Sequence, residues 1–311
     1  MEKQGIPLLF MISWFQKGES LIMNILVLGG TRFFGKALID ILLSEGHQIT
    51  VATRGNQRPS FLKECSFVKV DRSSLKQMSK AFSGKQFDVI YDQLCFNAAD
   101  AAISTEVFRG HTGHYIMTST MAVYPDSRQA LFEKDFNPAL VSLQGDSEEQ
   151  TGYGEGKQLA EAVFAQHASF VTTYVRFPVV LGTSDYTNRL ETLVDRIRNE
   201  TPIGIADTGI KQSFISAEDA ARFLAWIKDK PLKGAVNAAS QGTITPAQLL
   251  NRIGELTKTE PRTTADITVE NQYPFPHTTY FMDTTKARKS GFLFEAVEPM
   301  IEDTVQNILY R

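Results

Sequence analysis

Short runs of mostly apolar, β-prone residues recur between Met23 and Arg176, and each has the length of a strand. Apolar residues fill these runs nearly throughout instead of alternating with polar ones. This pattern is typical of strands in a parallel sheet that helices cover on both faces. The runs are NILVLGG (24–30), HQITVATR (47–54), SFVKVDR (66–72), FDVIYD (87–92), HYIMTST (114–120) and FVTTYVRFP (170–178).

Amphipathic stretches separate the strand-like runs and predict helices over Lys36–Ser44, Leu75–Phe82, Ala98–Phe108 and Gly156–His167. Strands that alternate with helices in this way require right-handed crossovers between parallel strands. The sequence therefore predicts an α/β fold, a doubly wound parallel sheet of the Rossmann type, over residues 23–182.

Beyond Gly182 the alternation fades, and the pattern predicts helices over Leu190–Arg198, Ala217–Ile227 and Pro246–Leu256 among short strands and Pro-rich loops. We expect residues 183–311 to form mainly a smaller, substrate-binding lobe over the carboxyl edge of the sheet. Some of its segments are expected to return to the first domain.

The first residues contain an apolar stretch, Ile6–Phe15, that weakly resembles the front of a signal peptide. The stretch is too short to span a bilayer, and no small-residue cleavage site follows it before Lys17. A strand pattern begins directly after Met23. We interpret residues 1–22 as an N-terminal extension of a soluble protein, either an upstream start or a loosely attached segment.

Composition and charge exclude several classes of protein. The chain has 311 residues, of which 42% are hydrophobic and 22% charged, which is ordinary for a globular protein. The net charge of -3 lacks the basic excess of a dedicated nucleic-acid binder, so no nucleic-acid partner is expected. The only cysteines, Cys65 and Cys95, form neither a disulfide framework nor a metal site, which favours a cytoplasmic location.

The first predicted strand leads into a glycine turn, Gly29-Gly30-Thr31-Arg32-Phe33-Phe34-Gly35, and then into a helix. Glycines let a backbone approach a pyrophosphate closely, and the start of a helix offers unpaired N–H groups to it. The middle glycine of the usual fingerprint is Arg32 here. The turn predicts a dinucleotide-binding domain, and the alternative is a tight connection that binds nothing.

The end of the second strand bears on the choice between NAD and NADP. An NAD site normally places an acidic residue there to accept hydrogen bonds from the ribose, but this chain has Thr53 and Arg54. Arginine pairs with a 2′-phosphate, so the sequence favours NADP. Asp71, at the end of the third strand, is placed to meet the adenine or to cap the helix that follows.

A tyrosine and a lysine stand four residues apart, at Tyr153 and Lys157, near the start of a predicted helix. This spacing places both on one helical face, where an ammonium lowers the pKa of a phenol from about 10. They follow a strand that ends in the hydroxyl residues Thr118, Ser119 and Thr120. Such hydroxyls hold a substrate oxygen beside the tyrosine or bond to nearby backbone.

These motifs resemble the short-chain dehydrogenase/reductase superfamily, in its extended branch of nucleotide-sugar epimerases and dehydratases. The resemblance runs from about Met23 nearly to the C-terminus, and the GGTRFFG turn resembles an atypical GGxxxxG subgroup that includes chloroplast mRNA-binding proteins. It implies that Thr120, Tyr153 and Lys157 are catalytic. It also implies a homodimer formed through the helices after Ala98 and Gly156.

The same resemblance implies an NAD(P) cofactor. No metal is expected, because His111 and His114 have no partners at ligand spacing and the two cysteines fit no metal site. The residues expected to bind the cofactor are Gly29, Gly30, Thr31, Arg32, Phe33, Phe34, Gly35, Thr53, Arg54, Asp71, Arg72, Gln93, Lys157 and Pro178.

Two departures from the family pattern bear on the substrate. Sugar 4,6-dehydratases follow the catalytic threonine with an Asp-Glu pair, whereas this chain has Met121 and Ala122, so dehydration of that type is not expected. Members that grip a nucleotide-sugar pyrophosphate often have an arginine where this chain has Gln212.

We therefore expect an NAD(P)-dependent epimerase or oxidoreductase that acts on a secondary hydroxyl or ketone of a small molecule, a sugar or nucleotide sugar among them. The motifs do not separate epimerisation from dehydrogenation. The alternatives are a regulator that senses NADP without turnover and an RNA-binding protein on the same fold.

Overall fold

A seven-stranded, wholly parallel sheet forms the centre of the computed structural model, which describes residues 21–56, 63–127, 129–143, 152–230 and 232–311. The strand order is β10-β6-β5-β4-β1-β2-β3, so the order reverses between β1 and β4. In open α/β sheets, such a reversal opens a crevice at the carboxyl ends of the strands. The strands are β1 (Asn24–Leu28), β2 (Gln48–Thr53), β3 (Ser66–Lys69), β4 (Phe87–Asp92), β5 (Thr112–Thr120), β6 (Val171–Phe177) and β10 (Gly234–Asn237).

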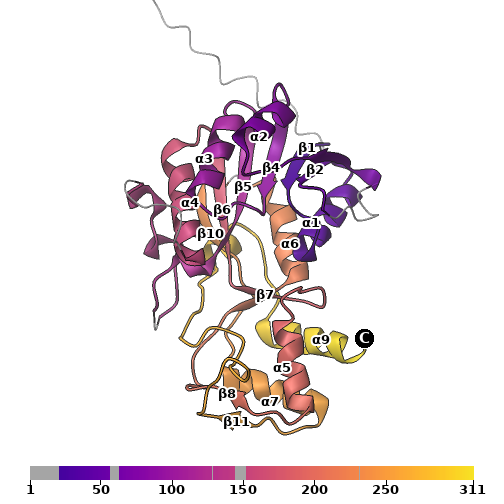
Figure 1. Cartoon of the computed structure of the whole chain (residues 1–311), viewed down its shortest axis with the longest axis vertical. Helices are drawn as coiled ribbons and strands as arrows, with labels where there is room; N and C mark the ends of the chain where they lie inside the picture. The colour runs from indigo at the N-terminus through magenta and orange to yellow at the C-terminus, as the bar shows by residue number, and fades with distance from the viewer. Residues whose placement is uncertain (1–20, 57–62, 128, 144–151, 231) are drawn as a thin grey trace, which may run out of the picture.

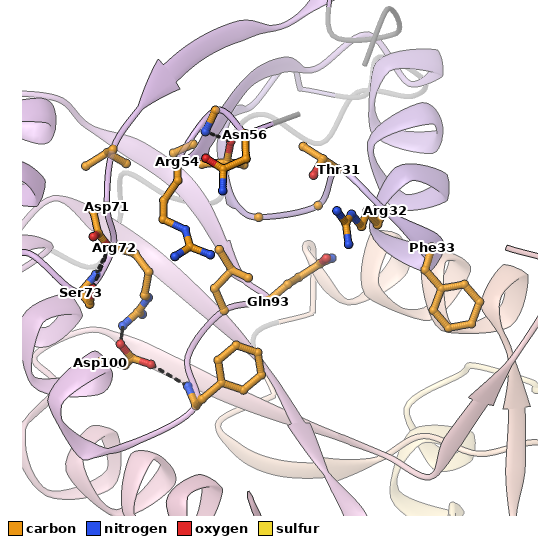
Figure 2. A pocket seen from close by; sticks show the side chains of 18 of the residues that line it. Thr31, Arg32, Phe33, Arg54, Asn56, Asp71, Arg72, Ser73, Gln93 and Asp100 are labelled. Carbon is orange, nitrogen blue, oxygen red and sulfur yellow. Dashed lines mark hydrogen bonds and ion pairs between the residues drawn. The ribbon is translucent and has the colours of Figure 1, made fainter. Parts of the chain in front are cut away.

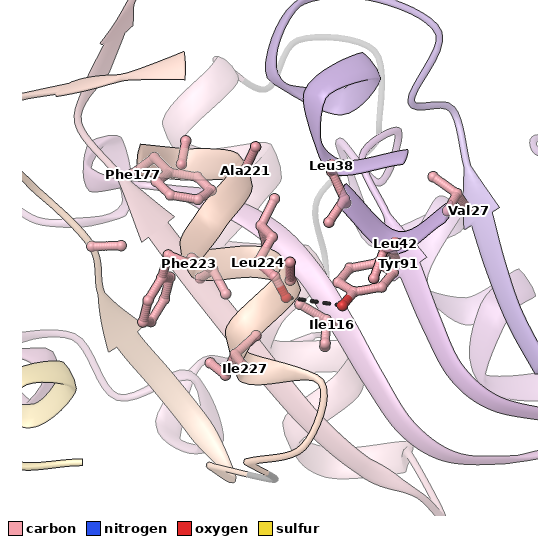
Figure 3. Packing of buried hydrophobic residues seen from close by; sticks show 14 of the residues in the cluster. Val27, Leu38, Leu42, Tyr91, Ile116, Phe177, Ala221, Phe223, Leu224 and Ile227 are labelled. Atoms are coloured by element: carbon pink, nitrogen blue, oxygen red, sulfur yellow. Dashed lines mark hydrogen bonds between the residues drawn. The ribbon is translucent and has the colours of Figure 1, made fainter. Parts of the chain in front are cut away.

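Helices cover both faces of this sheet (Figure 1). On one face lie α1 (Phe33–Ser44) and α6 (Ala217–Ile227), and on the other α2 (Leu75–Phe82), α3 (Ala98–Val107) and α4 (Tyr153–His167). Figure 3 shows Leu38 and Leu42 of α1 beside Leu224 of α6, where the Tyr91 hydroxyl donates to the Leu224 carbonyl at 2.9 Å. Burial on both faces explains why the strands are apolar nearly throughout.

Side-chain caps fix where several helices begin. Ser74 accepts a hydrogen bond from the Gln77 N–H at the start of α2, and Asn97 accepts one from the Asp100 N–H at the start of α3. Ser216 caps α6 in the same way. Each cap satisfies a backbone donor that the first helical turn leaves unpaired.

The second lobe lies at the carboxyl edge of the sheet and has its own apolar core (Figure 1). A two-stranded link of β7 (Val179–Leu181) and β9 (Phe214–Ser216) joins it to the first domain. Its elements are α5 (Arg189–Arg198), β8 (Ile203–Gly204), α7 (Pro246–Thr257), β11 (Thr263–Thr264) and α9 (Val297–Leu309). The short helix α8 (Thr285–Lys289) packs beside β10 of the first domain, where Lys286 Nζ donates to the Ala235 carbonyl at 2.5 Å.

The predicted fold class is confirmed, since the central sheet is parallel and doubly wound. Two helices begin three residues earlier than the sequence predicted: α1 at Phe33 and α4 at Tyr153. The seventh strand, β10, was not predicted because it has only four residues and follows the irregular part of the chain. The prediction for residues 1–20 falls outside the described residues, among which no helix is long and apolar enough to cross a membrane.

Candidate functional site

A cavity of about 570 Å³ opens at the carboxyl ends of the strands around the reversal in strand order. It contains most of the residues predicted to bind a cofactor: Gly29, Gly30, Thr31, Arg32, Phe33, Phe34, Thr53, Arg54, Asp71, Arg72 and Gln93. Three predicted residues do not line it. Gly35 lies beneath the turn, Pro178 is buried between β6 and β7, and Lys157 lies on α4.

Two features of the glycine turn require glycine: a left-handed backbone conformation at Gly30 and the close packing of α1 against the turn at Gly35. Gly30 has a φ of +75°, a left-handed conformation that favours glycine. A Cβ on Gly35 would meet Gln93 Oε1 at 2.3 Å and the Gly30 Cα at 2.7 Å, so only glycine lets α1 pack this closely against the turn. Arg32 has an extended backbone, with φ −139°, which explains why this position accepts a side chain.

Phe33 adopts a left-handed conformation, with φ 52°, which is unusual for a bulky residue. Its ring packs against Phe34, with ring centroids 5.6 Å apart, and against Tyr186 of the second lobe at 6.5 Å. Strained backbone of this kind persists where surrounding contacts hold it, and it clusters at ligand-binding sites. The turn is thus held in a defined shape from both lobes.

The cavity offers polar groups that suit a dinucleotide. Figure 2 shows the Arg54 guanidinium and the Gln93 amide reaching into this space. Gln93 Nε2 is buried and has no hydrogen-bond partner among the described residues, so it is a donor available to a ligand. Hydrogen bonds from Ser73 lower the pKa of Asp71, which keeps that carboxylate ionised at the cavity edge.

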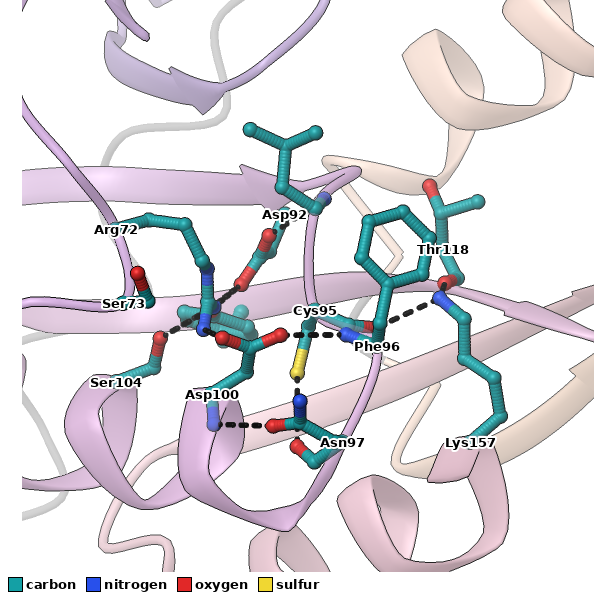
Figure 4. Close-up of polar contacts among 12 residues, drawn as sticks. Arg72, Ser73, Asp92, Cys95, Phe96, Asn97, Asp100, Ser104, Thr118 and Lys157 are labelled. Atoms are coloured by element: carbon teal, nitrogen blue, oxygen red, sulfur yellow. Dashed lines mark hydrogen bonds and ion pairs between the residues drawn. The ribbon is translucent and has the colours of Figure 1, made fainter. Parts of the chain in front are cut away.

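Arg72 lines the cavity, but its guanidinium is turned into the protein (Figure 4). It pairs with the buried Asp92, and its Nη1 lies 2.8 Å from Asp100 Oδ1. The Tyr115 hydroxyl donates to the same Asp92 carboxylate at 2.5 Å. The structure therefore gives Arg72 a supporting position beneath the cavity, where its charge is already paired.

Thr120 and Tyr153 meet at the carboxyl end of β5, next to this cavity. The Thr120 Oγ1 accepts the Ala122 N–H at 3.1 Å and keeps its own proton for donation, and Thr120 lowers the pKa of the neighbouring Tyr153 phenol. A Cβ on Gly154 would meet the Ala122 carbonyl oxygen at 2.4 Å. A glycine at this position therefore allows the first turn of α4 to lie close enough to bring the two hydroxyls together.

Lys157 lies one helical turn further along α4 and is almost completely buried. Its Nζ donates to the Cys95 carbonyl at 2.7 Å and to the Thr118 carbonyl at 2.8 Å (Figure 4). An ammonium has three donors, so one N–H remains. Nζ also lies 4.6 Å from the ring centroid of Phe96, a residue that lines the cavity.

The expected lowering of the Tyr153 pKa is wrong for this structure. Tyr153 as a whole is 58% exposed, but partial desolvation of its phenol by the surrounding protein raises the pKa above 10, while Thr120 and the charge of Arg189 lower it by less. Lys157 Nζ is 6.0 Å from the Tyr153 ring centroid and is bound to two carbonyls instead. The tyrosine is therefore protonated at neutral pH.

The neighbouring Ser119 has another partner. Successive strand residues point to opposite faces, so Ser119 points away from Thr120, and its hydroxyl donates to the buried Glu161 at 2.6 Å. Of the hydroxyl residues at this strand end, Thr120 is the one that acts on the pKa of Tyr153.

Gln212 is buried in the second lobe. Its Nε2 donates to the Pro276 carbonyl at 2.7 Å, and its Oε1 accepts the Tyr273 hydroxyl at 2.8 Å. Its amide thus supports the packing of the lobe. The neighbouring Lys211 is exposed, and its Nζ lies 5.8 Å from the ring centroid of Phe281.

Several cavity residues were missed by the sequence analysis. Asn56 lies two residues after the predicted Arg54 and Ser73 directly follows the predicted Arg72, and the loop after each strand was the signal for them. Phe96 follows β4 in the same way. Tyr186 comes from the second lobe, and nothing in its local sequence indicated that it lines the cavity.

The fold is similar to that of known epimerases. UDP-glucose 4-epimerase from Thermotoga maritima, solved with UDP-glucose, has a TM-score of 0.72 at 17% identity, covering 93% of this chain and 99% of that chain. UDP-glucose 4-epimerase from Thermus thermophilus, solved with NAD, has a TM-score of 0.69 at 17% identity, covering 92% and 99%.

Two curated proteins are similar in sequence. A chloroplast stem-loop binding protein of 41 kDa from Arabidopsis thaliana is 28% identical over 205 residues, which cover 61% of this chain and 50% of the relative. A 2'-dehydrokanamycin reductase from Streptomyces kanamyceticus is 26% identical over 125 residues, 40% of this chain and 35% of the relative. The match thus spans half of the length of these relatives, or less.

A family model matches residues 25–239, which include the glycine turn, Thr120, Tyr153 and Lys157. The match confirms the resemblance inferred from the sequence motifs. This chain belongs to the NAD dependent epimerase/dehydratase family.

Proposed function

We propose that the protein is an NADP-dependent epimerase or oxidoreductase that transfers a proton and a hydride at a secondary hydroxyl or ketone of a small molecule. The observation that carries this proposal is the close approach of the first turn of α4, which bears Tyr153, to the end of β5 at Thr120, beside a cavity that the glycine turn lines. The family match and the unpartnered Gln93 donor support the same assignment.

Each residue of the pair has a distinct part in the proposed reaction. The nicotinamide, when bound, accepts or supplies the hydride. Tyr153 keeps its proton at neutral pH and donates it to a substrate carbonyl oxygen as a general acid, and in the reverse direction it takes that proton back. Thr120 orients the substrate oxygen and bonds to the phenol. The remaining N–H of Lys157 holds the ribose.

The preference for NADP rests on Arg54. Its guanidinium reaches into the cavity after β2 (Figure 2). The residue before it in the sequence is the neutral Thr53, which also lines the cavity. A guanidinium pairs with a phosphate through two hydrogen bonds, whereas it cannot accept one from a ribose hydroxyl.

The buried Gln212 argues against a tightly held nucleotide sugar. Its amide is already bonded to Pro276 and Tyr273, so it offers nothing to a pyrophosphate. We expect UDP-glucose to bind weakly in the presence of NADP+, and calorimetry showing micromolar affinity would restore a nucleotide-sugar substrate.

The decisive experiment replaces Tyr153 with phenylalanine, which removes only the hydroxyl. Turnover is expected to fall about 10²-fold or more, while NADPH affinity stays near that of the wild type. Thr120→Val should lower turnover in the same way, and Lys157→Ala should weaken NADPH binding as well. Tyr310, which is 88% exposed, gives the matched control Tyr310→Phe. Unchanged turnover in Tyr153→Phe would remove the tyrosine from the mechanism.

Two alternatives have distinct signatures. The name of the Arabidopsis relative favours stem-loop binding, which salt-dependent retention of an RNA hairpin would support. A regulator that senses NADP would bind the cofactor and show no turnover with a broad panel of ketones and alcohols.

We also propose a cytoplasmic homodimer formed through α3 and α4, which pack side by side on one face of the sheet. Sedimentation analysis of the purified protein tests the dimer.

A further inference from the structure

A single peptide group joins Lys157 to a buried carboxylate beneath the cavity (Figure 4). The Cys95 carbonyl accepts a hydrogen bond from Lys157 Nζ at 2.7 Å, and the Phe96 N–H donates to Asp100 Oδ2 at 2.9 Å. This carbonyl and this N–H belong to the same peptide group, and in a planar trans peptide they point in opposite directions. The position of Asp100 therefore sets the position of an acceptor that Lys157 binds.

Asp100 is held in place by its own contacts. Its Oδ1 lies 2.8 Å from Arg72 Nη1, and its backbone N–H donates to Asn97 Oδ1 at 2.8 Å. Arg72 also pairs with Asp92, whose Oδ1 accepts the Leu94 N–H at 2.9 Å. Two N–H groups of the loop between β4 and α3 are thus bound to two carboxylates that one guanidinium holds together.

The direction of the Lys157 ammonium depends on this loop. Lys157 is 1% exposed, and besides the Cys95 carbonyl it donates to the Thr118 carbonyl at 2.8 Å. An N–H that donates to a carboxylate polarises its peptide group, so the carbonyl of that group becomes a stronger acceptor. Loss of the Asp100 carboxylate would therefore weaken and displace one of the two contacts that direct the remaining N–H of the ammonium.

We propose that Asp100 is a positioning residue for Lys157, acting through the Cys95–Phe96 peptide group so that the remaining N–H of the ammonium meets the nicotinamide ribose. This inference rests on the proposed function, because it takes Lys157 as the residue that binds the ribose. Both Asp100 oxygens are bound to protein groups, so the effect of this residue on a ligand passes through Lys157. Its loss should weaken ligands that carry the nicotinamide ribose and spare those that lack it.

Titrations with NADPH and with adenosine 2′,5′-bisphosphate test the proposal, because the second ligand keeps the adenosine and the 2′-phosphate but has no nicotinamide ribose. The variants are Asp100→Ala, Asp100→Asn and the matched control Asp219→Ala, each checked for folding by circular dichroism. Asp219 lies in the first turn of α6 and is also buried, pairs with Arg222, and accepts the Glu295 N–H at 2.7 Å. The described residues that line the cavity do not include it.

We expect Asp100→Ala to weaken NADPH binding about fivefold or more. Asp100→Asn should weaken it about two- to threefold, because an amide oxygen accepts a hydrogen bond less strongly than a carboxylate. Affinity for the bisphosphate should stay at the wild-type value in both, and Asp219→Ala should leave both affinities unchanged.

The proposal is overturned if the folded Asp100 variants bind NADPH as well as the wild type. It is also overturned if they lose affinity for both ligands equally, which is the result of a merely structural role. If Asp100→Ala does not fold, Asp100→Asn decides by the same criteria.

Lys157→Ala separates failure of this inference from failure of the proposed function. If Lys157→Ala binds NADPH as well as the wild type, the ribose contact is absent and both fail. If Lys157→Ala weakens NADPH binding and the Asp100 variants do not, only the positioning role of Asp100 fails.

Discussion

Replacing Glu161 with glutamine tests the buried ion pair that lies beneath the candidate site. Glu161 on α4 and Arg176 on β6 are both fully buried, and Oε2 lies 2.5 Å from Nη2. The other carboxylate oxygen accepts the Arg176 Nε–H at 3.0 Å and the Ser119 hydroxyl at 2.6 Å. The substitution removes the negative charge and leaves the size of the side chain nearly unchanged.

Breaking a buried pair by neutralising one partner costs about 3–5 kcal/mol, because the other charge stays buried without compensation. Arg176 would keep three neutral acceptors, namely the Tyr124 hydroxyl at 2.8 Å and the carbonyls of Glu133 and Phe136 at 3.1 and 3.2 Å. The glutamine would also keep one oxygen. We therefore expect the lower end of the range, about 3 kcal/mol of unfolding free energy.

Urea unfolding followed by circular dichroism measures this loss. Asp40→Asn is the matched control, because Asp40 pairs with Lys36 at 2.5 Å on the surface, where the two side chains are 46% and 50% exposed. Loss of this surface ion pair should lower the unfolding free energy by about 0.5 kcal/mol or less. If Glu161→Gln loses no more unfolding free energy than Asp40→Asn, the buried ion pair contributes no more to stability than a surface pair.

Three further outcomes are expected. Arg54→Ala should weaken NADPH about tenfold or more in a fluorescence titration and leave NADH unchanged, and an equal loss for both would contradict the phosphate contact. Gly154→Ala should lower turnover about tenfold or more with little change in NADPH affinity, because its Cβ would collide with the Ala122 carbonyl and displace the adjacent tyrosine. Burial lowers the pKa of His114, so the unfolded chain takes up a proton below about pH 6.5 while the folded chain does not. Unfolding free energy should therefore fall from pH 7.5 to 5.5, by up to about 1.4 kcal/mol per pH unit, in the wild type and in His111→Gln but not in His114→Gln.

The sequence was informative where short-range order determines the structure. The apolar strands and the turn that follows β1 located the cavity, because the carboxyl ends of parallel strands must meet at one edge. The approach of Tyr153 to Thr120 also followed from chain order, since α4 begins beside the end of β5.

What the sequence could not supply were contacts between distant segments. Tyr186 reaches the site from the second lobe, where the pattern of apolar residues is irregular. The position of Lys157 Nζ, bound to the Cys95 and Thr118 carbonyls and 6.0 Å from the Tyr153 ring centroid, is another contact that spacing along a helix does not reveal. The inward turn of Arg72 depends on Asp92 and Asp100, which lie on different elements.

The late return of α6 and β10 to the sheet has a consequence for synthesis and folding. During translation, α1 lacks the helix that packs beside it on the same face of the sheet until residues 217–227 emerge, and β6 is an open sheet edge until residues 234–237 follow. A nascent chain that stops near residue 182 exposes apolar helix surface and unpaired strand backbone, both of which favour aggregation. The glycine turn rests on α1, so the cofactor cavity takes its final shape only after part of the second lobe has left the ribosome.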